Sequence, residues 1–128
     1  SSFFDITTNQ TNYFRGTEKK SELKIQIVPL SSCLRSSMLN KKTLLKIDVQ
    51  GFELEVLKGS KSLFKYIDYI YCECSYIEFY SGQPLVNDII NYLNQEKFIL
   101  IGIHNQVYSK QGKQLQADFL FKNSGVRK

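Results

Sequence analysis

LLKIDVQGFELEVLKGS, residues 44–60, is the stretch of sequence that decides the fold. Its first six residues, 44–49, are apolar on both faces apart from Lys46 and Asp48. A run of this kind is typical of a central strand in a parallel sheet. Gly51 ends the strand, and the apolar residues that follow it change to helical spacing.

A helix is therefore expected from Glu53 onward, and its apolar stripe extends to residue 67. Gly59 interrupts this stripe, and a glycine inside a helix costs about 1 kcal/mol relative to alanine. We expect the first helix to end at Lys58 and a shorter one to begin with Ser60 as its N-cap.

Downstream of this stretch, strands continue to alternate with helices. The predicted elements are, in order, a strand over 67–75, a helix over 85–96 opened by Pro84, a strand over 98–103, a turn over 110–113 and a strand through 117–121. Such alternation predicts an α/β fold with a mainly parallel sheet and a C-terminal antiparallel strand. Helices 53–66 and 85–96 are expected to lie on the faces of that sheet.

Upstream, the chain is polar and lacks a sustained apolar period up to about residue 22. A strand over residues 23–27, stopped by Pro29, and a short helical turn over 32–39 are expected to follow. The domain organisation that we expect is a loop-rich segment over about 1–22, an α/β core over 23–122 and a tail over 123–128.

The composition bounds the class of protein. The 128 residues, 42% apolar, suit one globular domain, and the lysines behind the net charge of +5 are dispersed, which indicates a solvated surface and no nucleic-acid partner. Three cysteines without a C-x-x-C pair indicate neither a disulfide framework nor a zinc site, and they favour a reducing compartment. No apolar run is long enough to span a membrane, and the opening Ser1 and its neighbours lack the features of a signal peptide, so we expect a cytoplasmic protein.

Residues 46–60, KIDVQGFELEVLKGS, closely resemble the signature K-I-D-V-E/Q-G-x-E-x-x-V-L-x-G-A/S of FkbM-like methyltransferases. The resemblance continues in ECS at 73–75, YSGQP at 80–84 and QADFLF at 116–121. It spans about residues 42–122, and five fixed polar and glycine positions within fifteen residues make it specific.

This resemblance implies a Rossmann-like class I fold that uses S-adenosylmethionine and methylates a hydroxyl of a small molecule or glycan, such as a sugar or secondary metabolite. The acid-x-Gly-x-Gly cofactor loop of the family does not occur in the 128 residues. We therefore expect the chain to be the C-terminal portion of the methyltransferase domain and to be inactive alone. The alternatives are a non-catalytic binding or interaction module and another nucleotide-dependent Rossmann-like enzyme.

Three carboxylates are the candidate catalytic groups. Asp48 and Glu73 come at the ends of two strands, where ligands bind in open α/β sheets, and both could converge on one substrate or one divalent ion. Glu53, in the first turn after Gly51, is the third, although an acid there can simply complement the helix dipole. Burial of an unpaired carboxylate is costly, which favours a function for Asp48.

Asp48 and Gly51 are the candidate cofactor-binding residues, although Gly51 can equally be required by the backbone conformation. A divalent metal is compatible with the paired acids, but no residue pattern supports one. His104 is the only histidine and comes at the end of a strand. In the family's strand order that strand lies two positions from the strand of Glu73, too far to join the candidate acids, so we expect His104 to be a surface residue. Tyr76 and Tyr80 are the tyrosines expected to line a pocket.

Overall fold

The computed structural model describes residues 42–125. The strand expected over 23–27, the turn expected over 32–39 and Cys33 lie outside the described residues. The elements are β1 (Leu44–Ile47), α2 (Glu53–Gly59), the 3-10 helix η3 (Lys61–Tyr66), β2 (Tyr69–Ser75), α3 (Val86–Gln95), β3 (Phe98–Tyr108) and β4 (Gln114–Asn123). The predicted order of elements from residue 44 onward is thus confirmed.

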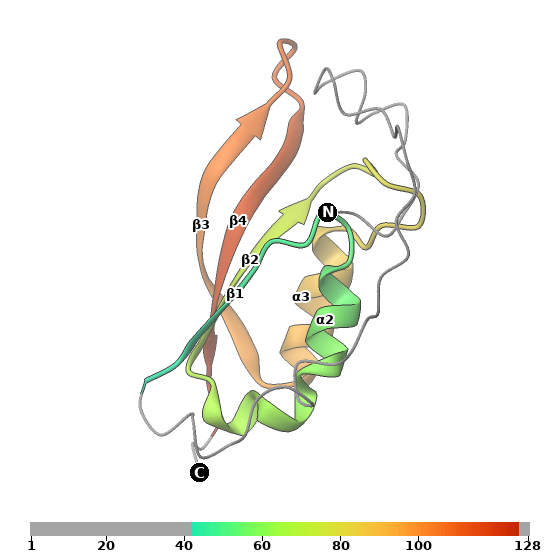
Figure 1. The fold of residues 1–128 in the computed structure, drawn as a ribbon. Helices are drawn as coiled ribbons and strands as arrows, with labels where there is room; N and C mark the ends of the chain where they lie inside the picture. The colour runs from blue at the N-terminus through green and yellow to red at the C-terminus, as the bar shows by residue number, and fades with distance from the viewer. Residues whose placement is uncertain (1–41, 126–128) are drawn as a thin grey trace.

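The four strands form one sheet in the order β1-β2-β4-β3 (Figure 1). β1 and β2 are parallel, whereas β4 is antiparallel to both β2 and β3. The C-terminal strand β4 is antiparallel, as expected, but the expectation of a mainly parallel sheet is wrong, because β4 lies between β2 and β3 and makes the sheet mixed. β1, β2 and β3 still run in the same direction, as expected for strands joined through helices.

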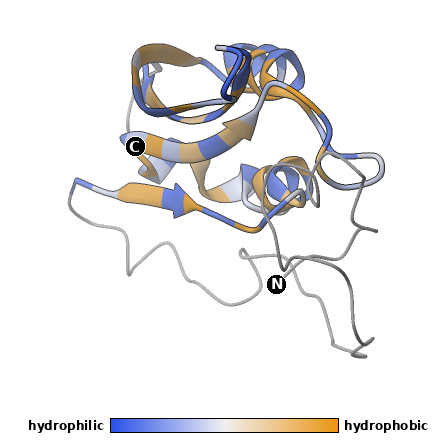
Figure 2. Cartoon of the chain, turned by 90° about the horizontal axis from the view of Figure 1, so that it is seen from above, coloured by the Kyte–Doolittle hydropathy of each residue, from blue (hydrophilic) through white to orange (hydrophobic). Residues whose placement is uncertain are grey.

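Both helices pack on the same face of the sheet, where Figure 1 shows α2 and α3 side by side. The core between them and the sheet contains Leu57 of α2, Ile89 and Leu93 of α3, and alternate residues of β2 and β4. Figure 2 shows hydrophobic and hydrophilic residues on different sides of the helices. Alternation along β2 buries Ile70 and Cys72 beneath the helices and directs Tyr71 and Glu73 to the opposite face.

The helix boundaries follow local chemistry. α2 ends at Gly59, one residue later than expected, and η3 begins after Ser60. Ser60 occupies the expected N-cap position, but its hydroxyl donates backward to the Val56 carbonyl at 2.7 Å and caps nothing. At α3, the Asp88 carboxylate accepts the Leu85 N–H at 2.8 Å, which fixes the start of that helix.

Two predictions about the buried surface can also be compared with the structure. Cys72 and Cys74 are free thiols that share the helix-covered face of β2, so they are small buried residues, as expected. Within residues 42–125, no helix has the length and apolar character needed to cross a membrane.

Leu57→Ala tests the packing of α2 on the sheet. Leu57 is fully buried, at 0% exposure, whereas Leu44 is 57% exposed on the outer strand β1. We expect Leu57→Ala to lower the free energy of unfolding by about 2–5 kcal/mol. The matched change Leu44→Ala should lower it by less than about 0.5 kcal/mol. Urea denaturation of both variants measures the difference, and similar losses would contradict this core.

Candidate functional site

The loop between β1 and α2 has an unusual backbone. Gln50 and Gly51 have φ angles of +49° and +101°, and these two residues turn the chain from the strand into the helix. A left-handed conformation at a residue other than glycine costs roughly 1–2 kcal/mol, so another contact has to hold the loop. The Gly51 conformation is one that residues with a side chain rarely adopt, which confirms the conformational explanation for this glycine.

Glu53 supplies the contact that holds this loop. Its side chain is 4% exposed, and both carboxylate oxygens accept the Gly51 N–H, at 3.1 and 3.0 Å. Burial raises the pKa of Glu53, the hydrogen bonds from Gly51 and neighbouring amides oppose that shift, and the charge of Asp48 adds to it. Glu53 therefore connects the buried start of α2 to the loop that carries Asp48 and Gln50.

Asp48 and Glu73 come together in a pocket of about 210 Å³ at the ends of β1 and β2. Ile47 pairs with Cys72 in parallel register, so the next residues along, Asp48 and Glu73, come side by side. The pocket is lined by Asp48, Gln50, Glu73, Ser75, Phe79, Tyr80, Gln83 and Gln116. It is therefore rich in carboxylate, amide and hydroxyl groups.

Gln83 fixes the wall of this pocket formed by the loop after β2. Its side-chain oxygen accepts the N–H groups of Phe79, at 2.8 Å, and Tyr80, at 3.3 Å. Its side-chain nitrogen donates to the Ser75 hydroxyl at 2.9 Å. All three contacts are buried, so the loop is attached to the end of β2 by a satisfied polar network. Sequence reasoning gave Gln83 no role; its place in the YSGQP segment at 80–84, which is part of the family resemblance, was the available signal.

The electrostatics of the pocket centre on Glu73. Burial, as the largest cause, and the charges of Asp48, Asp118 and Glu53 together raise its pKa from the usual 4.5 to about 7. Within residues 42–125, Glu73 has no hydrogen-bond or ion-pair partner that would favour the ionised form. Burial and the charge of Glu73 also raise the pKa of Tyr80, so its phenol remains protonated. Glu73 is thus a carboxylate that exchanges a proton near neutral pH.

The structure brings two of the three candidate acids together. Asp48 and Glu73 line the same pocket, whereas Glu53 lies behind the loop and outside the pocket lining. The premise that Asp48 is buried is wrong, because β1 ends at Ile47 and Asp48 is exposed; the buried carboxylate is Glu53.

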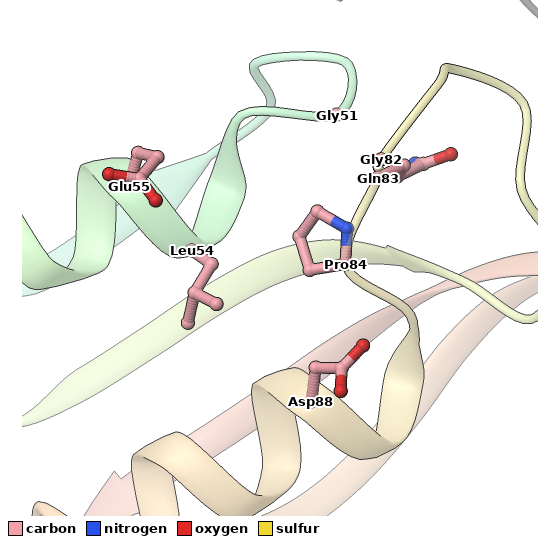
Figure 3. A pocket seen from close by; sticks show the side chains of 7 residues that line it. All are labelled: Gly51, Leu54, Glu55, Gly82, Gln83, Pro84 and Asp88. Atoms are coloured by element: carbon pink, nitrogen blue, oxygen red, sulfur yellow. The ribbon is translucent and has the colours of Figure 1, made fainter.

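Gly51 lines a neighbouring pocket of about 290 Å³, between the first turn of α2 and the loop before α3 (Figure 3). Gln83 lines both pockets, so the cavities that Asp48 and Gly51 line adjoin at this residue. The Gly51 N–H already donates to Glu53. Gly51 can therefore contact a ligand only through the surface of its backbone.

The remaining candidates divide as follows. Tyr80 lines the pocket, as expected, whereas Tyr76 packs its ring on Phe119 and does not. His104 is exposed on β3, two strands from Glu73, which confirms its surface position. In the part of the chain that the structure describes, no cluster of three or more His, Cys, Asp or Glu residues has the geometry to hold a metal ion.

Comparison with known proteins gives one match. Residues 1–100 match the family described as Methyltransferase FkbM domain. The match includes the loop from Asp48 to Glu53 and both strands that carry the pocket acids, and it also extends through residues 1–41. No curated protein and no solved structure matches the chain.

Glu53→Ala and Glu53→Gln together test the role of Glu53 in holding the loop. Both changes remove the buried charge, but only glutamine keeps an oxygen that can accept the Gly51 N–H. We expect the alanine variant to be less stable than the glutamine variant by about 1–3 kcal/mol, the cost of an unsatisfied buried donor. Equal free energies of unfolding in urea would contradict this role.

Glu73→Gln tests the protonation of the pocket acid through stability. The pKa of Glu73 is raised in the folded state, from 4.5 to about 7, so its favourable contribution is present below pH 4.5 and is lost as the pH rises through 7. Glutamine does not titrate. The free energy of unfolding of the variant, relative to that of the native chain, should therefore be higher at pH 8 than at pH 5. Urea denaturation of both proteins at both pH values measures this difference. A difference that is independent of pH would show that the Glu73 pKa is not raised.

Proposed function

This chain belongs to the FkbM methyltransferase domain family, and we propose that it serves the transfer of a methyl group from S-adenosylmethionine to a hydroxyl of a sugar or secondary metabolite. The observation that carries the proposal is the pairing of Asp48 with a Glu73 whose pKa is about 7 in one polar pocket. The mixed sheet and its two helices would form part of a larger Rossmann-like class I fold.

The lining of the pocket supports a hydroxylated acceptor. Gln50, Gln83 and Gln116 contribute amide groups, and Ser75 and Tyr80 contribute hydroxyls. Such groups both donate and accept hydrogen bonds, as recognition of a polyhydroxylated ligand requires. The volume of about 210 Å³ is below the roughly 300 Å³ at which pockets for whole drug-sized ligands begin, so it suits the reacting part of an acceptor.

Glu73 is the proposed general base. A base works best when its pKa lies near the operating pH, because it is then both ionised and basic enough to take the proton. Glu73 meets this condition, since burial and three neighbouring carboxylates raise its pKa to about 7. In the proposed reaction, Glu73 accepts the proton of the acceptor hydroxyl, and the oxygen becomes a stronger nucleophile.

Asp48 and Gly51 are the residues proposed to face the cofactor. When bound, S-adenosylmethionine supplies an electrophilic methyl group on a positively charged sulfur. The exposed Asp48 carboxylate fits a cationic group through charge attraction, and the adjoining pocket at Gly51 offers a surface without a side chain. Glu53 supports both residues by holding the loop between them and α2, and it acts in this proposal as a positioning residue.

The two pocket acids provide the test, in the full-length protein with S-adenosylmethionine and a panel of monosaccharides and methyl glycosides. We expect Glu73→Gln and Asp48→Asn each to lower kcat by about 10²–10⁴-fold, the scale of a lost general base or its charged partner. Asp48→Asn should change the free energy of unfolding by less than about 0.5 kcal/mol, because Asp48 is exposed.

Glu96→Gln is the matched control, since it removes one carboxylate that pairs with Lys61, away from the pocket. Its kcat should equal that of the native protein. The formation of S-adenosylhomocysteine measures the rate, and calorimetry measures binding of S-adenosylmethionine. A full-length protein that binds no cofactor would contradict the proposal and favour a non-catalytic binding module, and variants within about threefold of native activity would remove both acids from the mechanism.

A further inference from the structure

Asp118 of β4 lies directly opposite Glu73 of β2 in the antiparallel register. Side chains at opposite positions of such a pair point to the same face, with Cβ atoms about 4.5–5.5 Å apart. Like charges at this position destabilise a sheet. Both residues are partly buried on the face that the helices leave open, so the pair needs an explanation other than stability.

Two side chains hold the Asp118 carboxylate in place. The Tyr71 hydroxyl donates to its Oδ2 atom at 3.0 Å, and the Asn105 side-chain amide donates to the same oxygen at 2.7 Å. Burial and the adjacent Asp118 raise the pKa of Tyr71, so the phenol keeps the proton that it donates. These two donors therefore hold the Asp118 carboxylate in one position opposite Glu73.

The backbone of β3 is distorted where it supplies one of these donors. The pairing with β4 is irregular between His104 and Val107, and Asn105 in that irregularity has a φ of +53°. Bulges commonly redirect a side chain beside a functional site. Here the bulge places the Asn105 amide on Asp118 and on the Tyr71 hydroxyl, at 2.7 and 3.2 Å.

We propose that Asp118 is a positioning residue whose fixed charge, held by Tyr71 and Asn105, keeps Glu73 a proton-accepting base at neutral pH. This role rests on the proposed function of Glu73. The other charged or titratable groups around Glu73 are Asp48 after β1, Glu53 on α2, Lys46 of β1, which pairs with Tyr71, and His104 of β3, which pairs with Asp118. Asp118 is the one held by two side-chain donors.

The chemical reason is the link between charge and basicity. An isolated glutamate is fully ionised at neutral pH but is a weak base. A fixed negative charge beside it makes the ionised form less favourable, and the carboxylate then takes up a proton more readily. After burial and Asp48, Asp118 is the next contributor to the raised pKa of Glu73.

NMR titration of the full-length protein labelled with ¹³C-glutamate tests this role, with Glu73→Gln used to assign the signal. We expect Asp118→Asn to lower the titration midpoint of Glu73 by about one pH unit, the low end of the effect of a neighbouring charge. The pH at which kcat is half-maximal should fall by the same amount. The control Glu96→Gln removes a distant carboxylate and should leave both midpoints unchanged.

Asp118→Thr is a second neutral variant, chosen because threonine is favoured in strands. Whichever of the two Asp118 variants folds is sufficient to test whether Asp118 shifts the titration of Glu73. A Glu73 midpoint that stays within about 0.2 units of native would overturn the proposal, since about one unit is expected from a neighbouring charge. A purely structural Asp118 would lower stability without moving the midpoint. If the midpoint moves but Glu73→Gln remains active, the role of Asp118 stands and the proposed function of Glu73 fails. If Glu73→Gln is inactive and the midpoint does not move, the proposed function of Glu73 stands and the role of Asp118 fails.

Discussion

The hydrogen bond from the Gly51 N–H to Glu53 is the interaction on which the described site depends. The loop after β1 contains two successive residues with positive φ, a conformation that Gly51 adopts readily but Gln50 does not. A carboxylate at 4% exposure binds the second of them. Because Glu53 is also the first residue of α2, this one contact joins the packed helix to the loop that follows Asp48.

Sequence reasoning was successful where the information is local. Helical spacing of the apolar residues over 85–96 predicted α3, and the turn over 110–113 before the strand through 117–121 predicted that β4 is antiparallel. The order in which strands pair is not encoded locally, since β4 would show the same alternation at an edge of the sheet or between two strands. Only the family resemblance correctly predicted that the strands of Glu73 and His104 lie two positions apart. The mainly parallel sheet was wrong for this reason.

The same distinction explains the site. A carboxylate at the end of an apolar run predicted that Asp48 and Glu73 would share a pocket, because parallel strand ends meet at one edge. Burial could not be assigned in this way. Asp48 extends past its strand into solvent, whereas Glu53, which looked like an ordinary first-turn acid, is turned inward by the loop. Gln83 and Asp118 acquire their roles from contacts across several elements, which no spacing along the chain encodes.

β2 joins the hydrophobic core to the pocket through its two faces. Ile70, Cys72 and Cys74 point toward the helices, and Tyr71 and Glu73 point away from them. A slip of one residue in the pairing of β2 would exchange the two sets, placing thiols in the pocket and a carboxylate in the apolar interior. The free-energy difference that disfavours this shifted register therefore also determines where the acid lies. Any molecule whose core has formed correctly has Glu73 on the pocket side of the sheet.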